Sequence, residues 1–321
     1  MRPVDERLIE NGDITLRVEV TGDGPTVVCV PGWPELSSSW RHQVAHLSRR
    51  HRVAALDVRG YGGSSVPPEV DRYTLRELAS DVAAVATALD DEPVVLIGHD
   101  WGAPIVWNTA IRHPGRVRAV AGLSVPHTPA IGISLLDLFD QLYADRFFYM
   151  LHFRQPGVPE AEFGADLRGA LKRCFFALSG DAPPGSWLPD APRDAAFLAL
   201  LPEPPDGPLS FLPDDELDAL VASFERTGMI GAFNRYRAAA LDAAADADVI
   251  GATVAQPSCF IGGELDPVRS MLPGTDLFTE PGAGCTDFRG ATIVGGAGHW
   301  VHQEAVAETN AALDAFLASL A

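Results

Sequence analysis

The chain has 321 residues, of which 24 are Lys or Arg and 43 are Asp or Glu, so its formal net charge is −19 at pH 7. This acidic balance argues against nucleic acid and against an anionic membrane surface as partners. A hydrophobic content of 47% is typical of a globular protein, and no run approaches the roughly 20 apolar residues of a membrane span. The chain is longer than a domain with one small hydrophobic core needs to be, so we expect one large domain with an inserted second part.

Strand and helix patterns alternate through the first part of the chain, which is typical of an α/β sheet. Residues 14–20 alternate apolar and polar side chains, as a half-buried strand does, whereas residues 26–30 are continuously apolar, as buried parallel strands are. Further strands are expected at 52–56, 94–97 and 117–123, and helices at 39–50 and 75–90.

The pattern changes after residue 125. From 126 to about 240 there are helical stretches but no clear strand, and we expect a helical cap or lid there. Within it, residues 181–213 contain nine prolines, which exclude a regular helix or a central strand and predict a long irregular connection.

Strands resume at 257–262 and 291–294, and a helix at 303–320 closes the chain. The fold class is therefore α/β, with a mostly parallel central sheet flanked by helices. We expect the first part of the core at 1–125, the cap at 126–240 and the second part of the core at 241–321.

Cysteine use argues against a structural metal. The four cysteines, Cys29, Cys174, Cys259 and Cys285, form no Cys-x-x-Cys pair, so we expect no zinc site and no metal or other cofactor. Cys29 and Cys259 lie in apolar runs as small core residues, which is typical of a reducing compartment. Residues 1–7 lack the apolar stretch of a signal peptide, and we expect a cytoplasmic location.

A sharp strand-to-helix turn is predicted at Gly98-His99-Asp100-Trp101-Gly102. In the nucleophile elbow of α/β-hydrolases, small residues stand two positions before and two after the nucleophile, which places Asp100 in that role. A carboxylate nucleophile forms an ester by attacking saturated carbon, which indicates alkyl transfer to water. The alternative is that Asp100 only caps the following helix.

Two further candidates follow predicted strands in the order that this fold expects, which is nucleophile, acid and histidine. Asp266 follows the strand at 257–262, where Glu264 is the competing acid, and His299 follows the strand at 291–294, where His302 is the competing histidine. A histidine can take a proton from water near neutral pH, and a second carboxylate orients its ring. Asp100, Asp266 and His299 therefore form the expected catalytic set.

The oxyanion hole is expected to use two backbone N–H groups. One belongs to Trp101, directly after the nucleophile, and the other comes from the loop Pro31-Gly32-Trp33-Pro34. Trp33 is the expected donor in this loop because prolines have no N–H.

Five segments carry a resemblance to one family. They are Gly98-His99-Asp100-Trp101-Gly102-Ala103, the loop 31–34, the glycine-rich loop 57–62 and the cap segments 148–158 and 231–237. Together they resemble the nucleophile motif, the two loops and the two ring-opening tyrosine segments of the α/β-hydrolase-fold epoxide hydrolases. The resemblance extends over nearly the whole chain.

The resemblance assigns the two ring-opening hydroxyls to Tyr149 and Tyr236. An epoxide that opens develops an alkoxide, which two phenol O–H groups would stabilise as it forms. The resemblance further implies a small-molecule epoxide and water as substrates, a role in detoxification or secondary metabolism, and a substrate pocket lined by Trp33, Trp101, Tyr149, Tyr236 and Trp300. The alternative for both tyrosines is packing within the cap.

Three positions depart from the family pattern. Pro31 replaces the usual histidine of the first loop, Arg154 stands where glutamine is common, and His152 stands where an aromatic residue is common. We expect Arg154 and His152 either to line the pocket or to lie on the surface of the cap.

Three other functions compete with epoxide hydrolysis. A haloalkane dehalogenase would use the same aspartate and would bind halide through Trp101, without needing Tyr149 and Tyr236. A fluoroacetate-type dehalogenase is disfavoured because its family has arginine where this chain has Trp101. A catalytically silent scaffold that binds a small molecule or a partner is disfavoured by the complete set of Asp100, Asp266 and His299.

Overall fold

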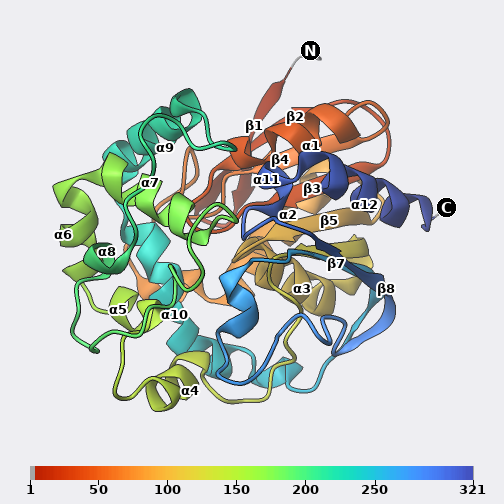
Figure 1. The fold of residues 1–321 in the computed structure, drawn as a ribbon. Helices are drawn as coiled ribbons and strands as arrows, with labels where there is room; N and C mark the ends of the chain where they lie inside the picture. The colour runs from red at the N-terminus through yellow and green to blue at the C-terminus, as the bar shows by residue number, and fades with distance from the viewer. Residues whose placement is uncertain (1–3, 321) are drawn as a thin grey trace.

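An eight-stranded sheet forms the centre of the computed structural model, which describes residues 4–320 (Figure 1). Its strand order is β1-β2-β4-β3-β5-β6-β7-β8. The pairs β1–β2 and β2–β4 are antiparallel, and every pair from β4 to β8 is parallel. The strands are β1 Asp5–Asn11, β2 Ile14–Thr21, β3 Thr26–Val30, β4 Arg52–Leu56, β5 Val94–His99, β6 Val117–Leu123, β7 Val254–Gly263 and β8 Cys285–Val294.

Burial explains which strands the sequence reveals. All residues of β3 and β5 are buried, because helices cover both faces of a parallel sheet. Strand β1, in contrast, buries only Ile9. No alternation marks such an edge strand, and the sequence analysis missed it. The other edge, β8, is also mostly exposed, and it begins six residues before the predicted strand.

Two groups of helices cover the two faces of the sheet. Side chains of α2 and α3 pack with Val28 and Val30 on one face, whereas those of α1 and α12 pack with Val27 and Cys29 on the other. The helices around the sheet are α1 Arg41–Leu47, α2 Leu75–Leu89, α3 Gly102–Arg112, α11 Val301–Glu304 and α12 Val306–Ala318. The helix predicted at 303–320 is thus divided, because Ala305 leaves the helical conformation at φ −128° and ψ 64°.

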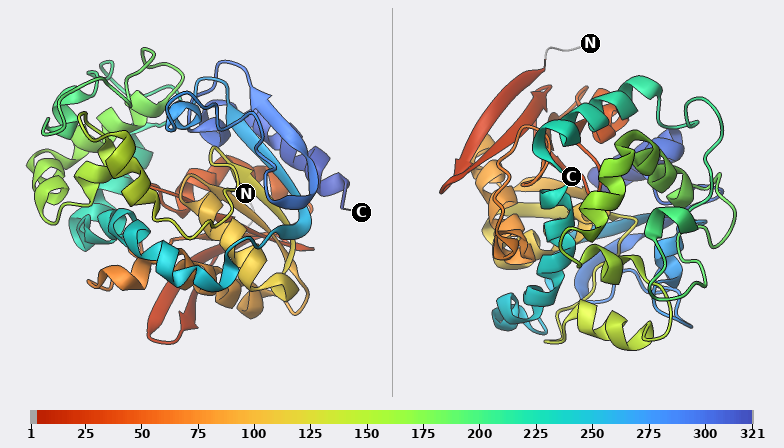
Figure 2. Two further views of the ribbon diagram at one scale, coloured as in Figure 1. Left: turned by 90° about the horizontal axis from the view of Figure 1, so that it is seen from below. Right: turned by 90° about the vertical axis from the view of Figure 1, so that its left-hand side faces the viewer.

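Seven helices lie between β6 and β7 in the sequence, and Figure 2 shows most of them gathered beside the sheet rather than on its faces. They are α4 Leu135–Leu142, α5 Tyr149–Phe153, α6 Val158–Ala165, α7 Leu167–Leu178, α8 Phe197–Leu200, α9 Asp214–Thr227 and α10 Ile230–Ala245. Short 3-10 helices are η1 Ser37–Trp40, η2 Val70–Tyr73, η3 Pro114–Arg116, η4 Ala247–Val249 and η5 Pro267–Ser270.

The proline-rich segment 181–213 contains only the four-residue helix α8 and is otherwise irregular. This agrees with the prediction from its nine prolines. Across residues 4–320, we find no helix with the length and apolar character needed to cross a membrane.

Candidate active site

Asp100 occupies a strained turn between β5 and α3. Its φ of 50° lies in the left-handed region, which non-glycine residues rarely adopt. The turn is so tight that a Cβ on Gly98 would lie 2.2 Å from the carbonyl oxygen of Gly102, and a Cβ on Gly102 would lie 2.0 Å from that of Val30. Only glycine fits at these two positions, and strain of this kind often accompanies function.

Both carboxylate oxygens of Asp100 have partners. The backbone N–H of Trp33 donates to Oδ1 at 2.7 Å, and Nε2 of His299 lies 3.2 Å from Oδ2. The loop that carries Trp33 is in direct contact with the turn, since a Cβ on Gly32 would lie 2.4 Å from the Asp100 Cβ. Among the described residues, the backbone N–H of Trp101 has no hydrogen-bond partner, so it is available to an oxygen of a bound group.

His299 joins Asp100 to Asp266. Its Nδ1 lies 3.1 and 3.0 Å from the two oxygens of Asp266, which fixes the ring orientation. Asp266 in turn accepts from the backbone N–H of Val268 at 2.9 Å, and both side chains are almost completely buried. The competing acid, Glu264, is exposed and accepts from the N–H of Gly296 instead.

The charges around His299 favour its protonated form. Burial alone would lower the pKa of the imidazole, but the side chains of Asp266 and Asp100 raise that pKa well above its usual value. The imidazole ring lies between the two aspartates, within hydrogen-bond distance of both.

Tyr149 and Tyr236 meet above the Asp100 turn. Tyr149 begins α5 and Tyr236 lies within α10, yet their ring centroids are 5.9 Å apart. The Tyr236 ring also packs edge-on against Trp33 at 5.8 Å and Trp101 at 5.5 Å, the two tryptophans next to the carboxylate. Burial, with the nearby charge of Asp100, raises the pKa of both phenols, so both remain proton donors at neutral pH.

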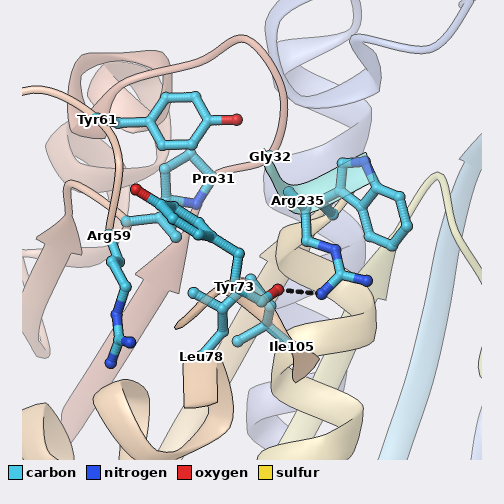
Figure 3. Close-up of a pocket in the computed structure, with 10 residues that line it drawn as sticks. Pro31, Gly32, Arg59, Tyr61, Tyr73, Leu78, Ile105 and Arg235 are labelled. Carbon is cyan, nitrogen blue, oxygen red and sulfur yellow. Dashed lines mark hydrogen bonds between the residues drawn. The ribbon is translucent and has the colours of Figure 1, made fainter. Parts of the chain in front are cut away.

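Helix α10 is held on the core by its own side chains. The guanidinium of Arg235 donates to the carbonyl oxygen of Tyr73, as Figure 3 shows, and lies 4.5 Å from the Trp101 ring. Asn234 donates to the carbonyl oxygen of Pro68. These contacts fix the helix turn that carries Tyr236 against the loops around the nucleophile.

A small cavity lies next to these contacts, and Figure 3 shows residues that line it. Its lining residues are Pro31, Gly32, Val58, Arg59, Tyr61, Tyr73, Leu78, Trp101, Ile105 and Arg235. Neither the Asp100 carboxylate nor a cap tyrosine is among them, so we do not assign the cavity as the reaction site.

Trp300, expected in the substrate pocket, packs behind His299 instead. Its indole N–H donates to the carbonyl oxygen of Phe175 at 2.8 Å, and its ring contacts those of His299 and His99. The side chain is fully buried and contacts neither cap tyrosine in the way that Trp33 and Trp101 do. Trp300 therefore supports the histidine from behind.

The two cap positions that depart from the family pattern lie away from the reacting groups. Arg154 pairs with Asp140 at the surface. His152 is buried and pairs with Glu162 at 2.8 Å inside the cap. Glu162 also accepts from the N–H of Leu198 and so connects this pair to the proline-rich segment.

A buried polar network that the sequence analysis missed lies beneath the turn. Glu35 accepts from Nδ1 of His99 at 2.7 Å and from the amide of Gln303 at 2.9 Å, and Nε2 of His99 donates to the carbonyl oxygen of His299. His302, the competing histidine, lies 3.4 Å from Glu35 and makes no contact with Asp100 in this arrangement. Glu35, His99 and His302 are spaced closely enough to hold a metal ion, but the short His99–Glu35 hydrogen bond occupies that space.

Trp187 is a second residue that the sequence analysis missed. It comes from the proline-rich segment, yet its ring lies 5.0 Å from that of Tyr149 and 6.2 Å from that of Trp33. One feature of the sequence could have singled it out, since Trp187 is the one aromatic residue between Phe176 and Phe197.

Comparison with known proteins adds independent information. The profile of the alpha/beta hydrolase fold family matches residues 25–268. Epoxide hydrolase A of Mycobacterium tuberculosis is 38% identical over 98% of both chains. An epoxide hydrolase from an endophytic Streptomyces has a similar structure, with a TM-score of 0.92, 36% identity and coverage of 99% of this chain and 96% of its own. Epoxide hydrolase A from Mycobacterium thermoresistibile gives a TM-score of 0.89 at 39% identity, with 98% of each chain covered.

Proposed function

This chain belongs to the epoxide hydrolases of the α/β-hydrolase fold, and we propose that Asp100, His299 and Asp266 carry out its two chemical steps. The enzyme opens an epoxide to a vicinal diol. In the first step a carboxylate displaces the ring oxygen from carbon and forms an ester, and in the second step water hydrolyses that ester.

Asp100 is the nucleophile of the first step. Its Oδ1 is held by the Trp33 N–H, which leaves Oδ2, on the side of His299, to attack the epoxide carbon. The new C–O bond neutralises the carboxylate. The Trp33 N–H, together with that of Trp101, is then available to stabilise the oxyanion that forms when water attacks the ester.

Tyr149 and Tyr236 act on the other end of the breaking bond. Both phenols are buried and protonated, so their O–H groups can donate to the epoxide oxygen as negative charge develops on it. The meeting of these two rings above the Asp100 turn is the observation that carries the proposal, because a carboxylate nucleophile alone would serve a dehalogenase equally well.

His299 acts as the base in the second step, and the charge on Asp100 determines when its ring can accept a proton. The Asp100 charge helps to keep His299 protonated in the resting site. When Asp100 becomes a neutral ester this contribution is lost and the pKa of His299 falls, so the imidazolium releases its proton to solvent and the neutral imidazole can then accept a proton from water. Asp266 then stabilises the imidazolium that forms again. A histidine pKa measured by NMR that does not fall in Asp100→Ala would contradict this timing.

The cap tyrosines distinguish epoxide chemistry from halide chemistry. The Trp101 ring packs edge-on against Tyr236, with ring centroids 5.5 Å apart, whereas a haloalkane dehalogenase would use the Trp101 indole for the departing halide and would need neither cap tyrosine. Diol formation from a panel of epoxides, measured in parallel with halide release from haloalkanes, separates the two reactions. Halide release without any diol would overturn the proposal.

The covalent step has its own test. His299→Gln retains the nucleophile and both tyrosines but lacks the base, so it is expected to form the ester and to hydrolyse it very slowly. Intact-protein mass spectrometry after addition of an epoxide should show one added epoxide mass, which peptide mapping places on Asp100. Turnover at the wild-type rate without an adduct would show that His299 has another role.

We also propose an apolar small-molecule epoxide as the substrate class and the cytoplasm as the location. The rings of Trp33, Phe153 and Trp187 around the tyrosines support an apolar substrate. The four cysteines are all free, which is compatible with a reducing compartment.

A further inference from the structure

Ser124 occupies a strained turn directly after β6. Its φ of 64° lies in the left-handed region, and across the turn the N–H of Val125 donates to the carbonyl oxygen of Leu123 at 2.8 Å. A three-residue turn of this hand is rare and strained. Within residues 4–320 the one other non-glycine residue with a positive φ is Asp100. Glycine adopts this conformation at no steric cost, so a serine at this position indicates a use for its hydroxyl group.

The hydroxyl group of Ser124 contacts the loop of the catalytic histidine. It donates to the carbonyl oxygen of His299 at 2.6 Å, and the Ser124 side chain is fully buried. The same carbonyl oxygen accepts from Nε2 of His99 at 2.8 Å. The N–H of His299 donates to the carbonyl oxygen of Leu178 in the cap at 2.9 Å. The backbone of His299 is thus held on both sides of its Cα, and Ser124 supplies the shortest of these bonds.

The same turn is fixed to the sheet and to the nucleophile. The N–H of Ser124 donates to the carbonyl oxygen of Ile261 in β7 at 2.9 Å, and the carbonyl oxygen of Leu123 also accepts from the N–H of Asp100 at 3.3 Å. Strained residues persist where the surrounding structure over-determines them, and these hydrogen bonds do so at Ser124. One rigid turn therefore contacts both the nucleophile and the base.

We propose that Ser124 is a positioning residue for ester hydrolysis, because its hydroxyl group fixes the His299 backbone and so keeps Nε2 directed at Asp100. This inference rests on the proposed function and adds no covalent step. During hydrolysis, water transfers a proton to Nε2 while its oxygen bonds to the ester carbonyl carbon, so the reaction depends on where the ring lies. Ester formation uses the Asp100 carboxylate and the two cap tyrosines. The loss of the Ser124 hydroxyl group should therefore affect the second step alone.

Two substitutions separate the hydroxyl group from the backbone strain. Ser124→Ala removes the hydroxyl group and keeps the strain, whereas Ser124→Gly removes the hydroxyl group and relieves the strain. Rapid quench and intact-protein mass spectrometry under single-turnover conditions measure the rates at which the ester forms and disappears. Both variants should slow ester hydrolysis by about tenfold, as the loss of one buried hydrogen bond would, and change ester formation by less than about twofold. Ser124→Gly should nevertheless unfold at a higher urea concentration than Ser124→Ala.

Two further measurements control for a general loss of packing. In a His299→Gln background the base is absent, so Ser124→Gly should change the residual rate of ester hydrolysis by less than about twofold. Ser258→Ala is the control for the loss of a buried hydroxyl group. The Ser258 side chain is also fully buried, and its hydroxyl group donates to a backbone carbonyl oxygen, that of Asp287, at 3.5 Å within the sheet. Ser258→Ala should leave both rates unchanged.

The outcomes are distinct. Hydrolysis at the wild-type rate in Ser124→Gly, or an equal slowing of both steps, would overturn the role of the hydroxyl group, and so would a tenfold loss that persists in the His299→Gln background. Ser124→Gly keeps the test decisive if Ser124→Ala does not fold. In each of these cases the wild-type protein would still form the ester and the diol. A wild-type protein that forms no ester on Asp100 would instead contradict the proposed function itself.

Discussion

Gly60 and Gly231 bring the glycine-rich loop of the core and helix α10 of the cap into direct backbone contact. A Cβ on Gly231 would lie 2.5 Å from the Gly60 Cα and 2.7 Å from the Gly60 carbonyl oxygen. Tyr236 follows five residues later on the same helix. The position of Tyr236 near Asp100 therefore depends on the close approach of Gly60 and Gly231, which a side chain at either position would prevent.

Gly231→Ala should displace α10 from the core and move Tyr236. We expect a loss of about 1–3 kcal/mol in the free energy of unfolding, as for other overpacked sites, together with slower ester formation. Gly164→Ala is the matched control, since a Cβ at this helical position of α6 meets nothing within 4 Å, and it should be neutral or slightly stabilising. Urea unfolding and single-turnover kinetics measure both effects, and equal behaviour of the two variants would refute the role of the contact.

Tyr149→Phe and Tyr236→Phe should each slow ester formation, by about 2–4 kcal/mol in activation free energy if the phenols act as other oxyanion donors do. One phenol can partly replace the other, so the double variant should lose far more. Tyr143→Phe is the control, because the third cap tyrosine donates to the carbonyl oxygen of Met271 rather than into the site. A double variant that opens epoxides at the wild-type rate would reduce both tyrosines to packing residues.

Glu304 ties the catalytic histidine loop to the cap. Its carboxylate accepts from the backbone N–H groups of Gly180, Gly298 and Trp300 at 2.8–2.9 Å, on both sides of His299. Glu304→Ala leaves three N–H groups without partners and should lower the free energy of unfolding by about 3 kcal/mol or more. Diol formation should fall as well, because the His299 ring loses its support. Glu280→Ala, at an exposed position, should change neither quantity.

Stability should decrease as the pH falls from about 6.5 to about 4. Burial lowers the pKa of both His127 and His302 from 6.5 to about 4, so the unfolded chain binds protons in this interval that the folded chain does not. Each histidine can contribute up to about 3 kcal/mol to the loss. His302→Gln should flatten the pH dependence of the unfolding free energy between pH 4 and 6.5. An unchanged slope in that interval would show that His302 does not carry this effect.

The fold could be predicted where burial is uniform or alternating. Strand β6 begins and ends as predicted at 117 and 123, because its apolar run is bounded by polar residues. Strand β1 could not be predicted, since a single buried side chain leaves no pattern. The last helix is divided at Ala305, next to Glu304, which binds the loop around His299. Because this is a tertiary contact, the local sequence pattern could not predict the division.

The site could be predicted where its residues follow strands. The structure brings Asp100, Asp266 and His299 into contact, as their order in the chain implied. The contact of Trp187 with Tyr149 could not be predicted. Trp187 stands out only as an isolated aromatic residue, because a proline-rich segment has no periodic pattern and Tyr149 lies 38 residues earlier. Trp300 was expected in the pocket because it follows His299 in the sequence. Consecutive side chains can point in different directions, however, and here His299 faces Asp100 while Trp300 faces the core.

The source of the oxygen in the diol tests the central claim most directly. With enzyme in excess over epoxide in H₂¹⁸O, a single turnover transfers an oxygen of Asp100 to the diol, because water attacks the ester carbonyl carbon and not the substrate. The diol of this first turnover should therefore carry no ¹⁸O, and the label should appear in the Asp100 side chain. A first-turnover diol that contains ¹⁸O, with an unlabelled Asp100, would contradict the covalent mechanism.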